Sequence, residues 1–232
     1  MASAPELILY TNHGCPWAHR AHIALAELGL PFKEEIIDLN TPRTEAYLKI
    51  NPRGLVPALS YNGEIITESA IVAQFLADAH PSHLLPASDA KDGALRRARI
   101  NFFVDTYFSK VNPLLFKIIG ASSEEEKAEL ARTKVETIVK EIEPLLSDAA
   151  PFFGGSDKIT LAEVQTGSFI LRVYSSAEYG LLPKTIVADL AEQAPNFTRW
   201  ADAVRNKESV NAIYDGESWV KRIQERFAKA KA

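Results

Sequence analysis

The stretch ELILYTNHGCPWAHRAHIALAELGLPFKEEIIDL, residues 6–39, contains a complete strand–helix–strand pattern. Residues 6–11 are a short apolar run typical of a buried strand. From Pro16 to Leu28 apolar residues recur at helical spacing, and Gly29 followed by Pro31 ends the pattern. Residues 32–39 then read as a second strand. A strand, a helix and a strand within this length predict a βαβ unit with two parallel strands.

The next forty residues complete a small α/β domain. Residues 43–49 predict a short helix, and two strand-like runs flank Asn62-Gly63, the strongest short signal for a β-hairpin. The amphipathic pattern at residues 68–80 predicts a third helix. The order βαβ, helix, ββα predicts a four-stranded mixed sheet with helices on its faces, which is a thioredoxin-like fold.

Beyond this domain the pattern changes to helices. Two prolines and several polar residues in 80–93 indicate a linker, and no strand is predicted after it. The division expected is therefore a thioredoxin-like domain at 1–82, a linker at 83–94 and an all-α domain at 95–232. Helices are predicted at 95–118 with a kink at Pro113, from the Ser123 capping box to 148, from the Thr160 capping box to 179, and at 184–193, 196–206 and 216–230.

Composition narrows the classes of partner. The 232 residues are 47% hydrophobic and carry a net charge of −4, and no basic stripe stands out. Nucleic acid and anionic membrane surfaces are therefore not expected as main partners. One cysteine excludes an intrachain disulfide, and residues 1–4 lack the features of a targeting signal. With no long apolar span, we expect a cytoplasmic protein.

Cys15, the one cysteine, lies between the first strand and the first helix. A thiol there faces the free N–H groups and positive dipole end of the helix, which favour a thiolate. Ala18 stands where a resolving cysteine would be, so a mixed disulfide at Cys15 needs a thiol from solution, and glutathione is the abundant one. The alternative is a small buried hydrophobe. The residue pattern alone leaves both interpretations open.

Four motifs together extend this interpretation. They are CPWAHR at 15–20, NPRGLVP at 51–57, Glu68-Ser69 and ITLAE at 159–163. In this order and spacing the set resembles the cytosolic glutathione transferases of cysteine type, as in the Omega class. The resemblance covers nearly the whole chain. It implies a glutathione-binding first domain, a substrate-binding helical domain, and Cys15 as the nucleophile, although Tyr10 lies near the position that tyrosine uses in other classes.

The resemblance also implies where glutathione binds. Val56, before a cis Pro57, would pair with the cysteinyl backbone as an added strand does. Glu68 would bind the γ-glutamyl ammonium, and Ser69 at the helix start would bind its carboxylate. Arg43 falls where the family has a lysine for the glycine carboxylate, with Lys49 and Arg53 as alternatives.

The remaining expectations concern the second substrate and assembly. The predicted substrate-pocket residues are Trp17, Tyr107, Phe108, Phe116 and Trp219, with Tyr174 as a further candidate. A homodimer is implied by the family. Thr160 and Glu163 are assigned to helix capping and folding. His13 and His19 flank Cys15 and could tune it, but the sequence shows no metal-site partner for either, so no metal is expected.

The function that fits is a glutathione-dependent thioltransferase of Omega type. Cys15 would form a mixed disulfide with glutathione during removal of glutathionyl groups, thioether reduction or dehydroascorbate reduction. A glutathionyl-quinone reductase-like enzyme shares CPWAHR but generally has a longer chain. A non-enzymatic glutathione-binding protein of the same fold is the alternative from a different class. The rate of alkylation of Cys15 distinguishes an enzyme from a binder.

Overall fold

The predicted βαβ unit opens the structure, a computed structural model that describes residues 5–231. Strand β1 (Leu7–Thr11) leads through a loop to helix α1 (Pro16–Leu28) and back to strand β2 (Lys33–Ile36), which pairs with β1 in parallel. Gly29 ends α1 in the left-handed conformation, with φ of 62°. The expectation about residues 1–4 lies outside the described residues.

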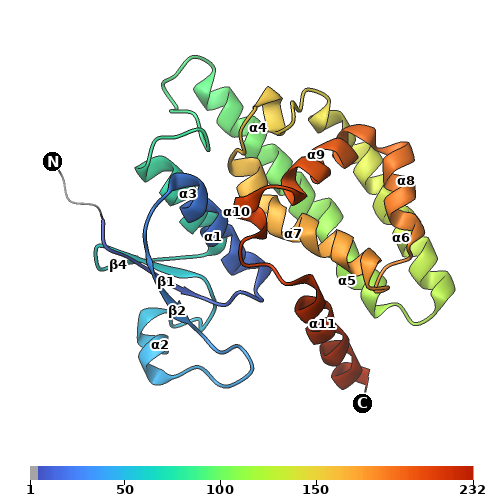
Figure 1. Ribbon diagram of the computed structural model, residues 1–232, viewed down its shortest axis with the longest axis horizontal. Coiled ribbons are helices and arrows are strands. Elements are labelled where there is room, and N and C mark those ends of the chain that lie inside the picture. Colours follow the sequence, from blue (N-terminus) through green and yellow to red (C-terminus); the bar gives the residue numbers. More distant parts are fainter. Residues whose placement is uncertain (1–4, 232) are drawn as a thin grey trace.

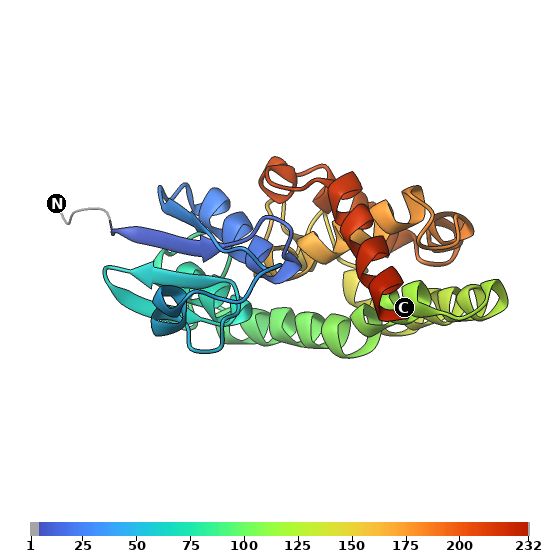
Figure 2. The same ribbon diagram turned by 90° about the horizontal axis from the view of Figure 1, so that it is seen from below.

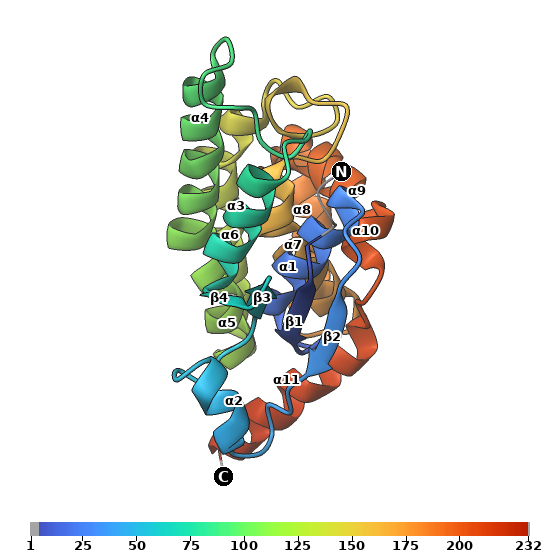
Figure 3. The same ribbon diagram turned by 90° about the vertical axis from the view of Figure 1, so that its left-hand side faces the viewer.

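The predicted hairpin completes the sheet. Strands β3 (Ala58–Tyr61) and β4 (Glu64–Thr67) are antiparallel, and their turn places Asn62 and Gly63 at φ of 52° and 90°. The strand order is β2-β1-β3-β4, and Figure 3 shows the strands in this order. With helices α2 (Glu45–Ile50) and α3 (Ser69–Ala79) this is the expected thioredoxin-like domain.

The second half is helical, as predicted (Figure 1). Between residues 80 and 231 the only β pairs are two isolated bridges, Ser82–Leu85 and Phe152–Ser156. The positions of the linker and of the domain boundaries stay predictions. The α-helices are α4 (Gly93–Thr106), α5 (Asn112–Gly120), α6 (Glu124–Glu141), α7 (Leu161–Glu178), α8 (Thr185–Gln193), α9 (Pro195–Arg205), α10 (Glu208–Asn211) and α11 (Gly216–Lys231).

Two predicted helices differ in detail, and proline explains both differences. The helix expected over 95–118 is divided by a π-helical turn, Tyr107–Val111, just before Pro113. Proline lacks the N–H that an α-helix needs at that position. Figure 2 shows that α4 and α5 still follow one another along one side of the molecule. The helix expected to reach residue 148 ends at Glu141, followed by a 3₁₀ turn that contains Pro144.

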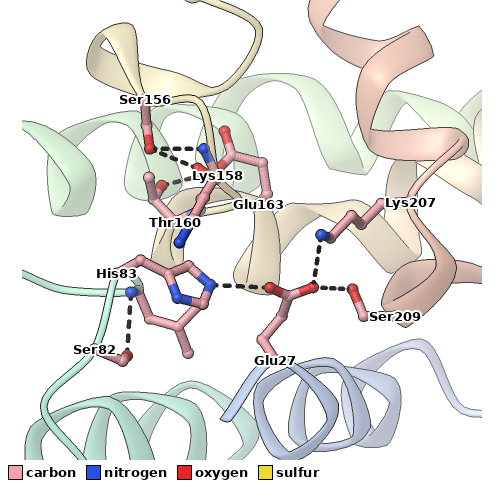
Figure 4. Close-up of polar contacts among 10 residues, drawn as sticks. Glu27, Ser82, His83, Ser156, Lys158, Thr160, Glu163, Lys207 and Ser209 are labelled. Carbon is pink, nitrogen blue, oxygen red and sulfur yellow. Dashed lines mark hydrogen bonds and ion pairs between the residues drawn. The ribbon is translucent and has the colours of Figure 1, made fainter. Parts of the chain in front are cut away.

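Helix α7 forms the centre of the helical domain and packs on α1. Its start is the predicted capping box. The Glu163 carboxylate accepts hydrogen bonds from the backbone N–H and from the hydroxyl group of Thr160 (Figure 4). The Glu163 carboxylate also accepts hydrogen bonds from the Phe153 N–H and from Trp200 Nε1. Burial raises the pKa of Glu163, while these hydrogen bonds act to lower it. This carboxylate therefore joins three segments of the helical domain.

A second carboxylate joins the two halves of the chain. Glu27, near the end of α1, lies 2.9 Å from His83 Nε2 and 3.4 Å from Lys207 Nζ, and it also accepts a hydrogen bond from Ser209 Oγ (Figure 4). Lys207 and Ser209 belong to the α9–α10 region, so the contact fixes α1 against the helical domain.

Among residues 5–231, no helix combines the length and the apolar character needed to cross a membrane.

Candidate functional site

Cys15 is the residue that precedes the first turn of α1. Its backbone is extended, with φ of −86° and ψ of 119°, and Pro16 occupies the first helical position. The side chain makes no capping hydrogen bond to α1, and the residue is partly exposed. Its sulfur lies 4.0 Å from the carbonyl oxygen of Val56. The thiol therefore stands at the helix N-terminus, facing the loop that ends at Pro57.

The loop that carries Cys15 is held by its own backbone and by Asn12. The Cys15 N–H donates to the Asn12 carbonyl at 2.9 Å, and the Gly14 N–H donates to Asn12 Oδ1 at 3.0 Å. Asn12 Nδ2 in turn donates to the Ile37 carbonyl at 2.9 Å. A Cβ atom at position 14 would collide with the guanidinium of Arg222. A glycine at position 14 therefore leaves room for the end of the Arg222 side chain against the loop.

A cavity of about 540 Å³ opens beside the sulfur. It brings together all the residues that the sequence predicts for glutathione, and the Val56–Pro57 peptide bond is cis, as expected. The predicted residues that line the cavity are Cys15, Trp17, Arg43, Val56, Pro57, Glu68 and Ser69. Segments from four parts of the first domain thus meet at one cleft.

Glu68 has an unusual backbone at the edge of this cavity. Its φ of 68° lies in the left-handed region, which is costly for a residue with a side chain. Its carboxylate lies 2.5 Å from Nη1 of Arg53. Arg53, one of the alternatives for the glycine carboxylate, therefore pairs with Glu68 but does not itself line the cavity. The Glu68 end of the cavity therefore combines a strained backbone with an exposed charged pair.

Arg43 lies in the wall of the same cavity, where it also holds the chain together. Its Nε donates to the Gly54 carbonyl at 2.9 Å, and its Nη1 donates to the carbonyls of Asp38 and Thr41. These bonds fix the guanidinium between two loops. Lys49, the other alternative, is an exposed residue in the last turn of α2 and is absent from the cavity wall.

Arg20, the last residue of the CPWAHR motif, is buried, although its side chain carries a charge. Its Nη1 donates to Ser69 Oγ at 3.1 Å, and its Nε donates to the Gln165 carbonyl on α7 at 2.8 Å. Burial lowers the pKa of Arg20 to about 9, while the Cys15 sulfur acts in the opposite direction. Arg20 therefore connects the cavity floor to the helical domain and remains charged at neutral pH.

A second buried guanidinium comes from α7. Arg172 Nη1 donates to the Ser168 carbonyl at 2.6 Å, and Nη2 reaches the Gly14 carbonyl at 3.4 Å. Burial lowers its pKa to about 10, and Tyr214 and Cys15 act to raise it. Arg20 reaches α7 across 145 residues, and Arg172 reaches the Cys15 loop across 158 residues, so no local pattern predicts these contacts.

The predicted substrate-pocket residues do not line one common cavity. Trp17 and Phe108 lie 5.3 Å apart between ring centroids and line a neighbouring cavity of about 510 Å³. Trp219 lines a different cavity, behind Gly14, together with Arg172. Tyr107 is buried in the core, and Phe116 lies half exposed on α5. Tyr174, the further candidate, is also buried.

The two histidines near Cys15 differ from each other. His19 is fully buried, with its ring stacked on Tyr214 at 6.3 Å, and burial lowers its pKa well below the ordinary value. His13 is exposed and lies 2.7 Å from Glu34 Oε1, while His22 Nε2 lies 3.4 Å from the same oxygen. The expectation that His13 has no partner for a metal site is therefore wrong, because the fold brings Glu34 and His22 to it.

Comparison with known proteins finds similarity to one family model and to several relatives. The family model described as Glutathione S-transferase, N-terminal domain matches residues 14–79. The chain is 30% identical to the probable glutathione S-transferase GSTU1 of Oryza sativa subsp. indica over 213 residues, which cover 87% of this chain and 86% of the relative.

Two solved structures of glutathione transferases are also similar to this chain. Rice GST1 in complex with glutathione superimposes with a TM-score of 0.83 at 27% identity, covering 98% of this chain and 99% of the other. Glutathione transferase Omega 2C from Trametes versicolor gives a TM-score of 0.79 at 27% identity, with 97% and 99% covered. The similarity therefore extends over both halves of the chain.

Proposed function

The chain belongs to the glutathione S-transferase family, and from this premise we propose that it is a glutathione-dependent thioltransferase with Cys15 as its nucleophile. The observation that carries the proposal is the position of the Cys15 sulfur, partly exposed at the start of α1 and 4.0 Å from the Val56 carbonyl. A serine or tyrosine hydroxyl at this place would activate glutathione, whereas a thiolate attacks glutathionyl sulfur itself.

The proposed reaction has two thiol–disulfide exchanges. In the first, the Cys15 thiolate attacks the glutathionyl sulfur of a mixed disulfide, the S–S bond to the substrate breaks, and the substrate leaves as its thiolate. In the second, a glutathione thiolate attacks the glutathionyl sulfur of the Cys15 adduct, which releases oxidised glutathione and restores the Cys15 thiolate. The chain has one cysteine, so a second glutathione must be the resolving thiol.

Three contacts would orient glutathione in the cavity. The ammonium and carboxylate of its γ-glutamyl end would meet Glu68, Arg53 and the start of α3 at Ser69. Its cysteinyl backbone would pair with Val56, whose carbonyl faces Cys15. Its glycine carboxylate would meet Nη2 of Arg43, since the other donor atoms of this guanidinium bind backbone carbonyls.

Two buried arginines place positive charge beside the proposed nucleophile. Arg20 and Arg172 carry positive charge near the sulfur, and neither forms an ion pair with a carboxylate among the described residues. Their charge adds to the positive end of α1. Trp17 and Phe108 would shape the entrance for the second substrate, because Trp17 lines both the glutathione cavity and the neighbouring one.

We also propose that two copies associate through α3 and α4. Ile71 on α3 is 57% exposed, and Leu95 and Phe102 on α4 are 62% and 60% exposed. Leu95 and Phe102 are seven residues apart and therefore lie on one face of the helix. An exposed apolar face of this kind marks a protein interface, and α3 and α4 come from different halves of the chain.

The thioltransferase assay with a glutathione mixed disulfide tests the proposed function. Cys15→Ser should abolish the activity, because the hydroxyl cannot form the mixed disulfide, while circular dichroism shows the wild-type fold. A matched variant, Ser60→Ala on β3, removes a hydroxyl outside the cavity and should retain activity. Wild-type rates in Cys15→Ser would show that another group does the chemistry.

A further inference from the structure

Three potential metal ligands meet on the side of α1 next to the Cys15 loop. They are His13 from the loop, His22 from α1 and Glu34 from β2. One donor atom from each lies within 4.8 Å of the donors of the other two. Within residues 5–231 no other group of histidine, cysteine and carboxylate side chains meets this condition.

The fold fixes this juxtaposition through the βαβ unit. Strand β2 pairs with β1 so that Glu34 lies opposite Leu9, at the edge of the sheet that α1 covers. His22 is 6% exposed, and its ring contacts the rings of Phe32 and His13 edge-on, with centroids 5.8 and 5.4 Å away. Aromatic packing therefore holds one imidazole in place, while His13 at the surface is free to adjust.

The distances suit a small divalent ion. Two ligands of a tetrahedral zinc ion, each at about 2.1 Å, lie about 3.4 Å apart. His22 Nε2 and Glu34 Oε1 lie 3.4 Å apart, and His13 Nε2 lies 2.7 Å from the same oxygen. A short outward movement of the exposed His13 side chain would leave space for the ion. Thr11 Oγ1, 2.9 Å from His22 Nε2, would give up its hydrogen bond to the ring.

The chemistry of the three side chains indicates which ions would bind. Two imidazoles and one carboxylate form a donor set that suits zinc and neighbouring transition metals better than calcium or magnesium.

We propose that His13, His22 and Glu34 form a site for one divalent transition-metal ion, with the fourth position open to water. The site is separate from the glutathione cavity, whose wall contains none of the three residues. Because His13 is two residues from Cys15, a bound ion would tie the loop that carries the nucleophile to strand β2. The ion has no role in the thiol chemistry proposed above.

Metal titration of the full-length Cys15→Ser chain tests this site without the competing thiolate. After removal of metal by a chelator and dialysis, calorimetry with Zn²⁺ should show one equivalent bound. Co²⁺ should give the visible bands of a four-coordinate ion. In the same background, Glu34→Gln and His13→Gln should each weaken Zn²⁺ binding by about tenfold or more, since each removes a ligand.

His83→Gln is the matched control, because His83 also pairs with a carboxylate, Glu27, but without a second histidine in the cluster. It should leave Zn²⁺ affinity unchanged. A second readout is thermal unfolding: Zn²⁺ should raise the melting temperature of Cys15→Ser but not of the chain that also carries His13→Gln. Absence of one-equivalent binding, or equal affinity in Glu34→Gln and the control, would overturn the proposal.

Discussion

The Cys15 sulfur lies 4.0 Å from the carbonyl oxygen of Val56, although the two residues are 41 positions apart. The relationship results from two short-range features: α1 starts immediately after Cys15, and Val56 lies two residues before β3, which pairs with β1. The sheet therefore places the helix N-terminus and the Val56 loop on two sides of one cleft. A glutathionyl group that pairs with Val56 would present its sulfur to Cys15.

Replacement of Glu68 tests the orientation of glutathione. Glu68→Gln keeps the size of the side chain but removes the charge that would hold the γ-glutamyl ammonium. We expect the KM for glutathione to rise roughly tenfold with kcat nearly unchanged, the pattern of lost uniform binding. Glu64→Gln, on β4 and exposed, is the control and should leave the KM unaltered. An unchanged KM in Glu68→Gln would place the ammonium elsewhere.

Replacement of Glu27 tests the contact between the two halves of the chain. Glu27→Gln loses the charge that binds His83 and Lys207, and a nearly buried amide replaces it. We expect the free energy of unfolding to fall by about 2 kcal/mol, as measured by urea denaturation. Glu129→Gln breaks an exposed pair with Arg132 and should cost about 0.5 kcal/mol or less. Equal losses in both variants would refute a special role for Glu27.

Acid should destabilise the protein through its buried imidazoles. Burial lowers the folded-state pKa of His22 to about 4 and that of His19 well below 6.5. Between pH 6.5 and 4 the unfolded chain therefore binds more protons than the folded chain, so stability falls as the pH falls through this window. At pH 5, His22 alone accounts for a loss of about 2 kcal/mol relative to pH 7.

Urea denaturation at pH 7 and pH 5, with a chelator present, measures this loss. His19→Leu removes one of the two buried imidazoles at similar volume, so its stability should decrease less between the two pH values. The same decrease in wild type and His19→Leu would mean that His19 does not contribute to the pH dependence.

The dimer proposal predicts a change in mass on disruption of the apolar face. Light scattering after gel filtration should show two copies for the wild type and one copy for Phe102→Asp, since a buried unpaired charge is costly at an interface. Tyr179→Ser removes a large side chain that is 44% exposed at the end of α7, and it should remain dimeric. A wild-type monomer, or a dimeric Phe102→Asp, contradicts the assignment.

Local patterns in the sequence predict most of the sheet domain, whereas the residues expected around the cleft come from the resemblance to a known family. Apolar spacing locates α1, the Asn62-Gly63 pair locates the hairpin, and the CPWAHR motif draws attention to Cys15. The reason is physical: strand alternation, turn geometry and helix capping depend on residues within a few positions of one another.

Features that depend on distant contacts are not predictable in this way. In the sequence, Arg20 is one residue of a predicted helix, and nothing near it indicates the contact with α7. Arg172 likewise lies in a mostly apolar helical pattern that does not indicate its contact with the Gly14 carbonyl. The association of His13 with Glu34 likewise requires the β1–β2 pairing. Proline effects are local by contrast: the sequence predicts the interruption at Pro113, but the amphipathic pattern alone does not reveal the helix end at Glu141 before Pro144.

The reactivity of Cys15 toward oxidised glutathione tests the central claim most directly. Intact mass spectrometry at neutral pH follows the appearance of one glutathionyl adduct, which excess glutathione should remove. The folded chain should form the adduct at a rate on the order of tenfold or more above that of the same chain unfolded in urea, because the fold places the sulfur at a helix N-terminus beside the proposed binding cleft. A folded chain that reacts no faster than the unfolded one would contradict the assignment of Cys15 as the nucleophile.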